Sequence, residues 1–219
     1  MRTVLVACWT VKGGAGATVV AAGMAAAQAQ LLRHDVLLVD LAGDQPLLHG
    51  LPPSSSAGLR GWTRAGPAVP VDALGRLEEP VDERRRLLPA GEGAWCDDRA
   101  HALAATLAGD ERIVVADVGQ EVGRPVGASL VAAAERSILV VRACPLSMRA
   151  LAELPAVPDA VVVVRDRRRA LGWRGVANRC GAPVVAEIEV DPAIGASVDA
   201  GETKRPFPRR FLLALGGAA

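Results

Sequence analysis

The sequence has very few aromatic residues and no long apolar run. Tyrosine is absent, and phenylalanine, tryptophan and tyrosine together make up 3% of the 219 residues. A stacking platform for single-stranded nucleic acid therefore has little to work with. The longest apolar runs, such as Val36–Val39 and Val161–Val164, fall far short of the roughly 18 apolar residues that span a bilayer, so we expect no transmembrane helix.

Metal-binding and disulfide patterns are also missing, and the charges nearly cancel. The four cysteines are scattered without a C-x-x-C pair, and the histidines do not cluster. The short apolar start leads straight into a glycine-rich turn, which argues against a secretory signal. With 25 basic and 24 acidic residues, there is no global field to attract nucleic acid or an anionic membrane. We therefore predict a cytoplasmic protein that is at most peripheral at the membrane.

Apolar, β-branched runs alternate with alanine-rich segments of helical spacing along most of the chain. This alternation predicts one doubly wound α/β domain over residues 1–219, with a mostly parallel sheet and helices on both faces. The predicted strands are Thr3–Trp9, Val36–Asp40, Arg112–Asp117, Ser137–Arg142, Ala160–Arg165 and Pro183–Glu189. The predicted helices are Thr18–Arg33, Asp98–Leu107, Gly127–Glu135, Ser147–Leu154, Arg168–Cys180 and Pro192–Ala200.

The alternation breaks between Gly43 and Gly93, where proline, glycine, serine and charged residues dominate. A structureless insertion of this length is uncommon in a compact domain. We therefore expect short elements within it. These are helices around Ala57–Arg64 and Val71–Leu77 and a brief strand near Arg86–Leu88.

A glycine-rich stretch, Val11–Thr18, follows the first predicted strand and opens an alanine-rich helix. Such a loop can turn backbone N–H groups toward phosphate oxygens at a helix N-terminus, and the Thr18 hydroxyl can ligate magnesium. Asp40 and Asp117 close two predicted strands, and would lie at the sheet edge where ligands of such folds bind. The alternatives are a turn that binds nothing, Thr18 as a helix N-cap, and carboxylates satisfied by loop N–H groups.

Several of these segments carry a family resemblance. Lys12-Gly13-Gly14-Ala15-Gly16-Ala17-Thr18 resembles the deviant Walker A motif, K-G-G-x-G-K-[ST], of the ParA/MinD ATPases. Val36–Asp40 is similar to the second strand of that family, and Ile113–Asp117 to its Walker B strand. The similarity continues through Ala133–Val141, Gly181–Val185, Asp191–Ile194 and Asp199–Gly201.

The resemblance implies a P-loop NTPase fold that binds ATP or ADP with Mg²⁺. By this resemblance magnesium would be held by Thr18, Asp40 and Asp117, and the catalytic residues would be Lys12 and Asp40. Lys12 would also cross a homodimer interface. The implied nucleotide-binding residues are Lys12, Gly13, Gly14, Ala15, Gly16, Ala17, Thr18 and Val19.

Three departures from the family pattern bear on activity. Ala17 stands where the family has the lysine that reaches the phosphates, so a source of charge is lost. Ala42 replaces the second Asp that arranges the attacking water, unless Asp44 reaches in from a shifted loop. The strand that commonly ends with an adenine-reading Asn ends here with Val164-Arg165-Asp166. We therefore expect at most a slow Mg²⁺-dependent ATPase, in which Lys12 partly replaces the missing charge.

The function that these features favour is a positioning or partitioning factor that dimerises with nucleotide and recruits a protein partner. One alternative is a nucleotide-independent scaffold of the septum-site or pilus-assembly kind. Another is binding to DNA or a membrane surface through basic clusters and a tail. The tail, Phe211–Leu215, is expected to pack on the sheet rather than to enter lipid. The basic clusters are Arg84–Arg86, Arg165–Arg169 and Lys204–Arg210.

Overall fold

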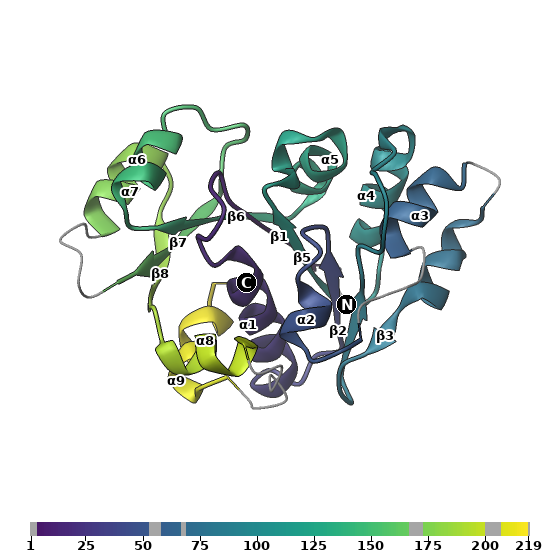
Figure 1. Ribbon diagram of the computed structural model, residues 1–219, viewed down its shortest axis with the longest axis horizontal. Helices are drawn as coiled ribbons and strands as arrows, with labels where there is room; N and C mark the ends of the chain where they lie inside the picture. Colours follow the sequence, from purple (N-terminus) through teal and green to yellow (C-terminus); the bar gives the residue numbers. More distant parts are fainter. Residues whose placement is uncertain (1–3, 53–57, 67–68, 167–172, 200–206, 219) are drawn as a thin grey trace.

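The computed structural model describes residues 4–52, 58–66, 69–166, 173–199 and 207–218, which form an eight-stranded sheet with helices on both faces (Figure 1). The strand order is β3-β4-β2-β5-β1-β6-β7-β8, and only β3 runs antiparallel to its neighbour. The predicted doubly wound, mostly parallel sheet is therefore confirmed. The strands are β1 (Val4–Trp9), β2 (Val36–Asp40), β3 (Glu79–Pro80), β4 (Arg85–Leu88), β5 (Ile113–Gly119), β6 (Arg136–Arg142), β7 (Ala160–Arg165) and β8 (Val184–Glu189).

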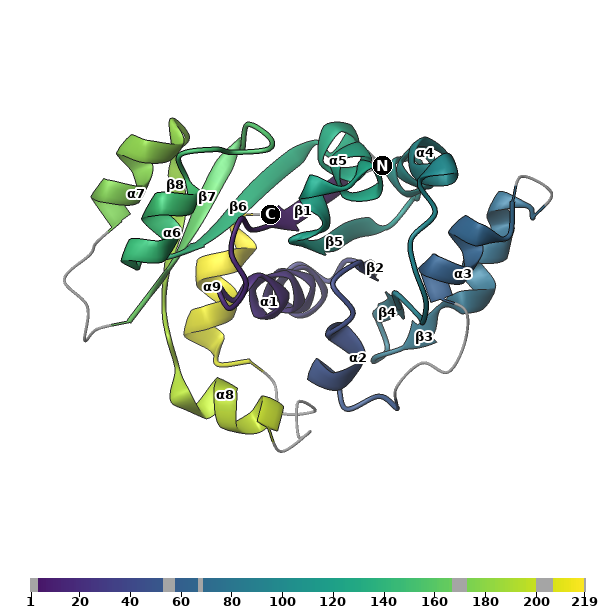
Figure 2. The same cartoon turned by 45° about the horizontal axis from the view of Figure 1, so that its top comes forward.

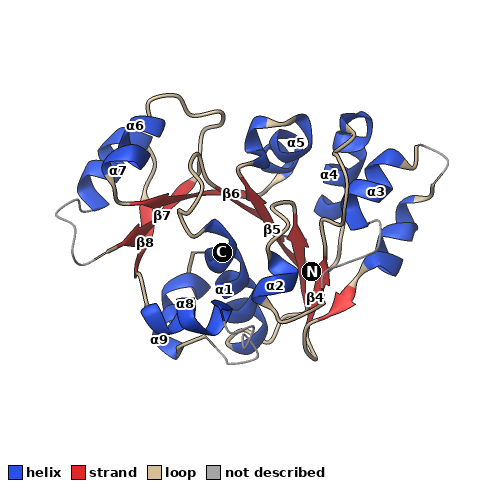
Figure 3. Ribbon diagram, in the orientation of Figure 1, coloured by secondary structure: helices blue, strands red, loops and turns tan. Residues whose placement is uncertain are grey.

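The helices divide between the two faces of the sheet (Figure 3). One face carries α3 (Gly58–Arg64), α4 (Ala100–Ala108), α5 (Pro125–Ala133), α6 (Pro145–Ala150) and α7 (Trp173–Cys180). The other carries α1 (Ala17–Gln30), α2 (Gln45–Leu48), α8 (Pro192–Asp199) and α9 (Arg209–Gly216). Three 3₁₀ turns complete the described elements, namely η1 (Val71–Leu77), η2 (Asp97–Arg99) and η3 (Glu121–Gly123).

The central strands separate two apolar clusters, one on each side of the sheet. In β1, Trp9 contributes to the α4 and α5 side, whereas Cys8 contributes to the α1 side. This alternation follows from the two-residue period of a strand. The Trp9 indole is fully buried and donates a 2.8 Å hydrogen bond to the Ser137 hydroxyl, so the end of β1 is fixed against β6.

Helix α9 packs mainly on α1, as the turned view shows (Figure 2). Phe211 and Leu215 are buried there, and a Cβ atom at Gly23 would overlap both side chains. The tail was expected to pack on the sheet. It is a buried helix as expected, but its main contact is with α1 rather than with the sheet. No helix in the described part of the chain is long and apolar enough to span a membrane.

The insertion folds as predicted in three places, with α3, η1 and β4 close to their expected positions, although residue 57 lies outside the described part. The short elements α2 and β3 were not predicted. Other boundaries shift: α1 ends at Gln30 because the chain turns with Arg33 at a left-handed φ of 62°. Helix α6 ends at Ala150, and the predicted helix 168–180 is described only from Trp173 onward.

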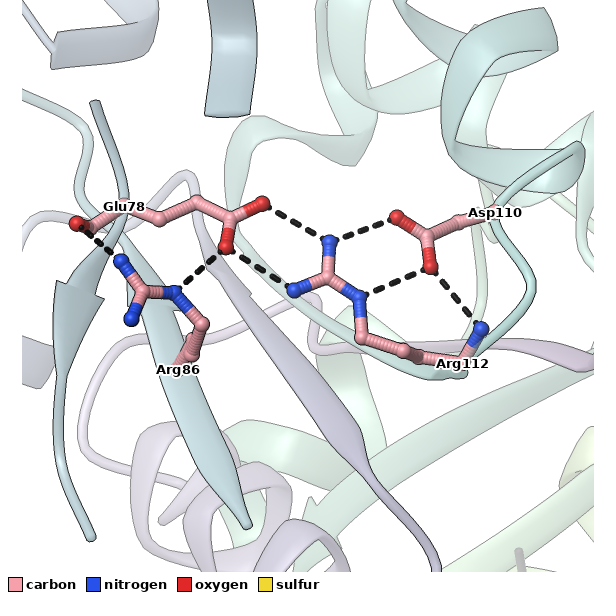
Figure 4. A network of polar contacts seen from close by, with 4 residues as sticks. All are labelled: Glu78, Arg86, Asp110 and Arg112. Carbon is pink, nitrogen blue, oxygen red and sulfur yellow. Dashed lines mark hydrogen bonds and ion pairs between the residues drawn. The ribbon is translucent and has the colours of Figure 1, made fainter. Parts of the chain in front are cut away.

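A charged network joins the starting ends of β4 and β5 (Figure 4). The guanidinium of Arg112 donates to both carboxylate oxygens of Glu78 and to both of Asp110, at 2.7 to 2.9 Å. Arg86 donates to the same Glu78 at 2.7 Å. These hydrogen bonds lower the pKa of Glu78 and Asp110, although partial burial opposes the shift. The network holds these strands together where β4 and β5 begin.

Candidate functional site

The loop between β1 and α1, residues 10–16, turns through two glycines in the left-handed region. Gly14 and Gly16 adopt positive φ angles of 72° and 93°, which side-chain-bearing residues rarely do. Gly16 is the N-cap of α1, whose first residue is Ala17, so the alternative that Thr18 is the N-cap is wrong. The loop is anchored by a 2.9 Å hydrogen bond from the Thr10 N–H to the Gly119 carbonyl.

Two positions bear on the charge of this region, Lys12 in the loop and Ala17 at the start of α1. Ala17 is buried against the apolar cluster around α1 and offers neither charge nor donor. The Lys12 ammonium donates to the carbonyl of the adjacent Gly13 at 2.9 Å. In this conformation the lysine charge stays on its own loop.

Asp40 lies at the end of β2 and is fully buried. One carboxylate oxygen accepts a 2.7 Å hydrogen bond from the Gly43 N–H, and the other accepts one of 3.2 Å from the Gln45 N–H. Burial raises the pKa of Asp40 to about 6, and these two hydrogen bonds limit the rise. Both oxygens of Asp40 are therefore engaged in shaping the loop that follows β2.

Asp117 lies opposite Asp40 on the paired strand β5 and is also fully buried. Burial raises the pKa of Asp117 to about 7, and the nearby charge of Asp40 adds to the rise. Strand β5 continues two residues beyond Asp117, to Gly119, so this carboxylate does not end its strand as expected.

Gln45, which sequence reasoning missed, connects the carboxylate to the loop. Its side-chain amide donates to Asp117 Oδ2 at 2.9 Å and to the Thr18 carbonyl at 3.0 Å. The anticipated inward move of Asp44 does not occur, because Asp44 is exposed at the N-cap of α2 while Gln45 is buried. The only signal in the sequence was a polar residue directly before a proline, Gln45-Pro46, a few residues after the predicted strand that ends at Asp40.

Two oxygen atoms at this point are buried and accept no hydrogen bond from the described residues. They are Asp117 Oδ1 and Gln45 Oε1. Since buried polar atoms are normally paired and Mg²⁺ prefers oxygen ligands, Asp117 and the neighbouring Thr18 hydroxyl fit a magnesium ion. Asp40 fits less well, because both of its oxygens already accept backbone hydrogen bonds. No cluster of three or more His, Cys, Asp or Glu able to hold a metal occurs within the described ranges.

A cavity of about 270 Å³ opens beside the loop. Its lining includes Gly14 and Gly16 of the loop, Val164 of β7, Ile188 of β8 and Phe211 of α9. Val164 belongs to the strand end Val164-Arg165-Asp166, where the family commonly has an adenine-reading Asn, and it gives this part of the cavity an apolar lining. The volume is close to the lower end of small-molecule pockets, which run from about 300 Å³ upward.

Many residues of the basic clusters and of the apolar tail noted in the sequence form contacts within the fold. Each arginine of the Arg84–Arg86 cluster forms an ion pair with an acidic side chain. The Arg165–Arg169 cluster is described only as far as residue 166, and the Lys204–Arg210 cluster only from residue 207. Phe211, Leu212 and Leu215 of the tail are buried in apolar clusters that include residues of α1, whereas Leu213 is exposed.

The loop, the strand order and the buried carboxylates together define a P-loop type of doubly wound α/β fold. Comparison with solved structures narrows this class to the fold of the ParA and MinD ATPases, which confirms the resemblance noted in the sequence. No family model matches the sequence, and no curated protein matches it at a significant level.

Three solved structures illustrate the likeness. A ParA family ATPase from Chlorobium tepidum shares 17% identity at a TM-score of 0.77, with 98% of each chain covered. The septum site-determining protein MinD from Pyrococcus horikoshii, complexed with Mg-ADP, shares 19% identity at 0.77, covering 98% of this chain and 94% of that one. MinD in the MinC:MinD complex from Aquifex aeolicus shares 17% identity at 0.70, with coverage of 98% and 94%.

Proposed function

We propose that the chain is a ParA/MinD-like nucleotide-binding positioning or partitioning factor. In this proposal ATP or ADP binds the loop at the start of α1, and binding is linked to homodimerisation and to recruitment of a protein partner. Hydrolysis is weak or absent. The proposal is supported by the fold and by the Mg-ADP and MinC complexes of structurally similar proteins.

The observation that carries the proposal is the backbone of the loop. Gly14 and Gly16 hold the positive φ angles that the turn requires, and Gly14, Ala15 and Gly16 line the adjacent cavity. A helix N-terminus with inward N–H groups attracts phosphate, because its orphan donors and its dipole both favour negative charge. The positive φ angles of Gly14 and Gly16 therefore support the binding of an anion at this loop.

Magnesium would be held by Thr18 and Asp117, and it would neutralise phosphate charge when bound. Asp40 keeps the role of shaping the loop that carries Gln45. Gln45 holds Asp117 and the first turn of α1 together through its two hydrogen bonds. Slow turnover is expected because Ala17 supplies no charge and Ala42 no carboxylate, and transfer of a phosphoryl group depends on both charge and an oriented water.

The test is calorimetric titration of the purified protein with Mg·ATP and with Mg·ADP, combined with light scattering to follow mass. We expect binding of both nucleotides and a doubling of mass with ATP alone. Lys12→Ala should lower both affinity and dimer formation if Lys12 leaves the Gly13 carbonyl to act across the interface. Binding and mass that are unchanged in this variant would contradict the role of Lys12.

A second candidate function is a scaffold that never binds nucleotide. It is favoured by the internal hydrogen bonds of the Asp40 and Asp117 carboxylates. Both Asp40 oxygens and Asp117 Oδ2 already accept hydrogen bonds from within the chain. This candidate predicts no heat and no thermal shift with nucleotide at millimolar concentration. Binding to DNA or to a lipid surface would instead appear as association that weakens steeply as salt rises.

A further inference from the structure

The cavity beside the loop contains one basic side chain, Arg142. Arg142 is the last residue of β6, and strand alternation places it on the same face as Val140 and Ile138, which pack toward α1. It pairs in register with Val164, and a Cβ atom added at Gly16 would lie 3.7 Å from the Val164 side chain. A strand end therefore delivers a guanidinium to the wall of the cavity that the loop opens into.

Arg142 is poorly satisfied within the fold. Its Nε atom is buried and donates no hydrogen bond to any described residue. Its closest ion pair, from Nη2 to Asp166 Oδ2, is 3.8 Å long, beyond hydrogen-bond range. A buried donor without an acceptor is uncommon in folded proteins, and the Arg142 side chain as a whole is 36% exposed, so its guanidinium is accessible to a ligand.

The acidic side chains of the same cavity do not supply that partner. Glu189 forms an ion pair with Arg165. Asp191 accepts hydrogen bonds from Arg210 and from the Ala193 N–H. Both acids are thus engaged with other groups, whereas Arg142 lines the same cavity as Gly14 and Gly16 of the loop.

The loop itself lacks a side-chain cation that faces the cavity. Ala17 is uncharged and buried, and the Lys12 ammonium is bound to the Gly13 carbonyl. Phosphate groups carry several negative charges, and a guanidinium binds them through paired N–H donors of fixed geometry. Arg142 is the one basic residue that the described cavity walls present to such a ligand.

We propose that Arg142 is the phosphate-binding cation of this site and supplies the charge that Ala17 does not. The inference rests on the proposed nucleotide binding and deepens it. It assigns the phosphates to the end of the cavity nearest the loop. The nucleoside then lies toward the apolar wall formed by Ile188 and Phe211.

The experiment compares Arg142→Gln with Arg136→Gln, since the two arginines occupy opposite ends of the same strand and the variants lose the same charge. Calorimetry with Mg·ADP should show affinity reduced roughly 10- to 100-fold in Arg142→Gln. Arg136→Gln should bind as the wild type does. Arg142→Lys should keep part of the affinity, because it retains the charge but not the planar fork.

Two further measurements separate the failure of this inference from that of the proposed function. Adenosine, which lacks phosphate, should bind the wild type and Arg142→Gln equally. The Arg142 Nε–H signal in nuclear magnetic resonance spectra of the wild type, assigned with Arg142→Lys, should shift when ADP is added, whether or not Arg142→Gln folds. Wild-type binding of ADP without that shift, or with undiminished affinity in Arg142→Gln, would overturn the role of Arg142 alone. A wild type that binds no ADP would overturn both proposals.

Discussion

Acidic residues at the two ends of the parallel strands differ in their ion pairing and in the direction of their pKa shifts. Where β4 and β5 begin, Glu78 and Asp110 are paired with arginines, and their pKa values lie below the ordinary range. Where β2 and β5 end, Asp40 and Asp117 are buried without an ion pair among the described residues, and their pKa values rise to about 6 and about 7.

This difference distinguishes acids that stabilise the fold through ion pairs from buried acids that have no such role. Paired acids stabilise the fold in the state that it already has. Buried acids that lack a cation oppose folding when they are ionised, so their presence points to a ligand or a chemical role. The acidic residues where the strands begin are therefore paired with arginines, whereas the two buried carboxylates at the opposite end of the sheet have no ion pair among the described residues.

Removal of Arg112 from its network with Glu78 and Asp110 should have the largest effect on stability. Arg112→Gln leaves Glu78 and Asp110 side by side without their shared cation, and we expect a loss of roughly 2 to 3 kcal/mol in the free energy of unfolding at pH 7. The loss should shrink in acid, because the lowered pKa values mean that this stabilisation disappears as pH falls through them. Urea unfolding at several pH values measures both effects.

A matched control for this change is Arg84→Gln, which breaks an exposed ion pair with Asp35. The cost there should stay below about 1 kcal/mol, since exposed pairs are weak. Equal losses in the two variants would remove the distinction between the network and ordinary surface charge.

Neutralising Asp117, one of the two buried acids, should stabilise the protein. Because the folded pKa of Asp117 is raised, wild-type stability falls as pH increases from about 4 to about 7 and stays low above that range. Asp117→Asn should therefore unfold with a free energy about 2 kcal/mol higher at pH 8, and the gain should be smaller at pH 5.

Thermal unfolding at pH 5 and pH 8 checks this prediction, with the exposed Asp98→Asn as control. Added Mg²⁺ should stabilise the wild type and leave Asp117→Asn unaffected. A stability difference that does not depend on pH would show that Asp117 is satisfied as an ion in the fold.

The smallest effect on stability is expected in the loop itself. Gly16→Ala places a side chain at a φ of 93°, which should cost about 1 kcal/mol in unfolding free energy. Nucleotide affinity should fall at least tenfold, because the turn must shift. Gly75→Ala is the control, since a Cβ atom there meets nothing and the backbone is unstrained. Titration and unfolding of both variants provide the comparison, and intact affinity in Gly16→Ala would argue against the loop as the binding site.

Most of the fold followed from local patterns in the sequence. Buried parallel strands are continuous apolar runs, so segments such as Val36–Asp40 were identifiable without tertiary information. The two-residue strand β3 was not, because its only support is pairing with β4. The packing of α9 on α1 depends on the missing side chain of Gly23, which no local pattern reveals.

The candidate site was predictable in its backbone and less so in its side chains. Glycines at 14 and 16 follow directly from the positive φ angles that the turn needs. Gln45 and Arg142 enter the site from a short helix and from a strand end, and their positions depend on how separate segments meet. Asp40 was predicted as a metal ligand, and its two backbone hydrogen bonds could be found only from the course of the loop after β2.

The fully buried Trp9 has a practical consequence for spectroscopy. It is the last residue of β1, directly before the loop, and its indole is hydrogen-bonded to Ser137. The chain has no tyrosine, so its intrinsic ultraviolet emission comes almost entirely from tryptophan. Trp9 is one of the four tryptophans that share this emission. Because it directly precedes the loop, ligand binding there is expected to change the fluorescence of Trp9, and a variant that keeps Trp9 alone would isolate this signal.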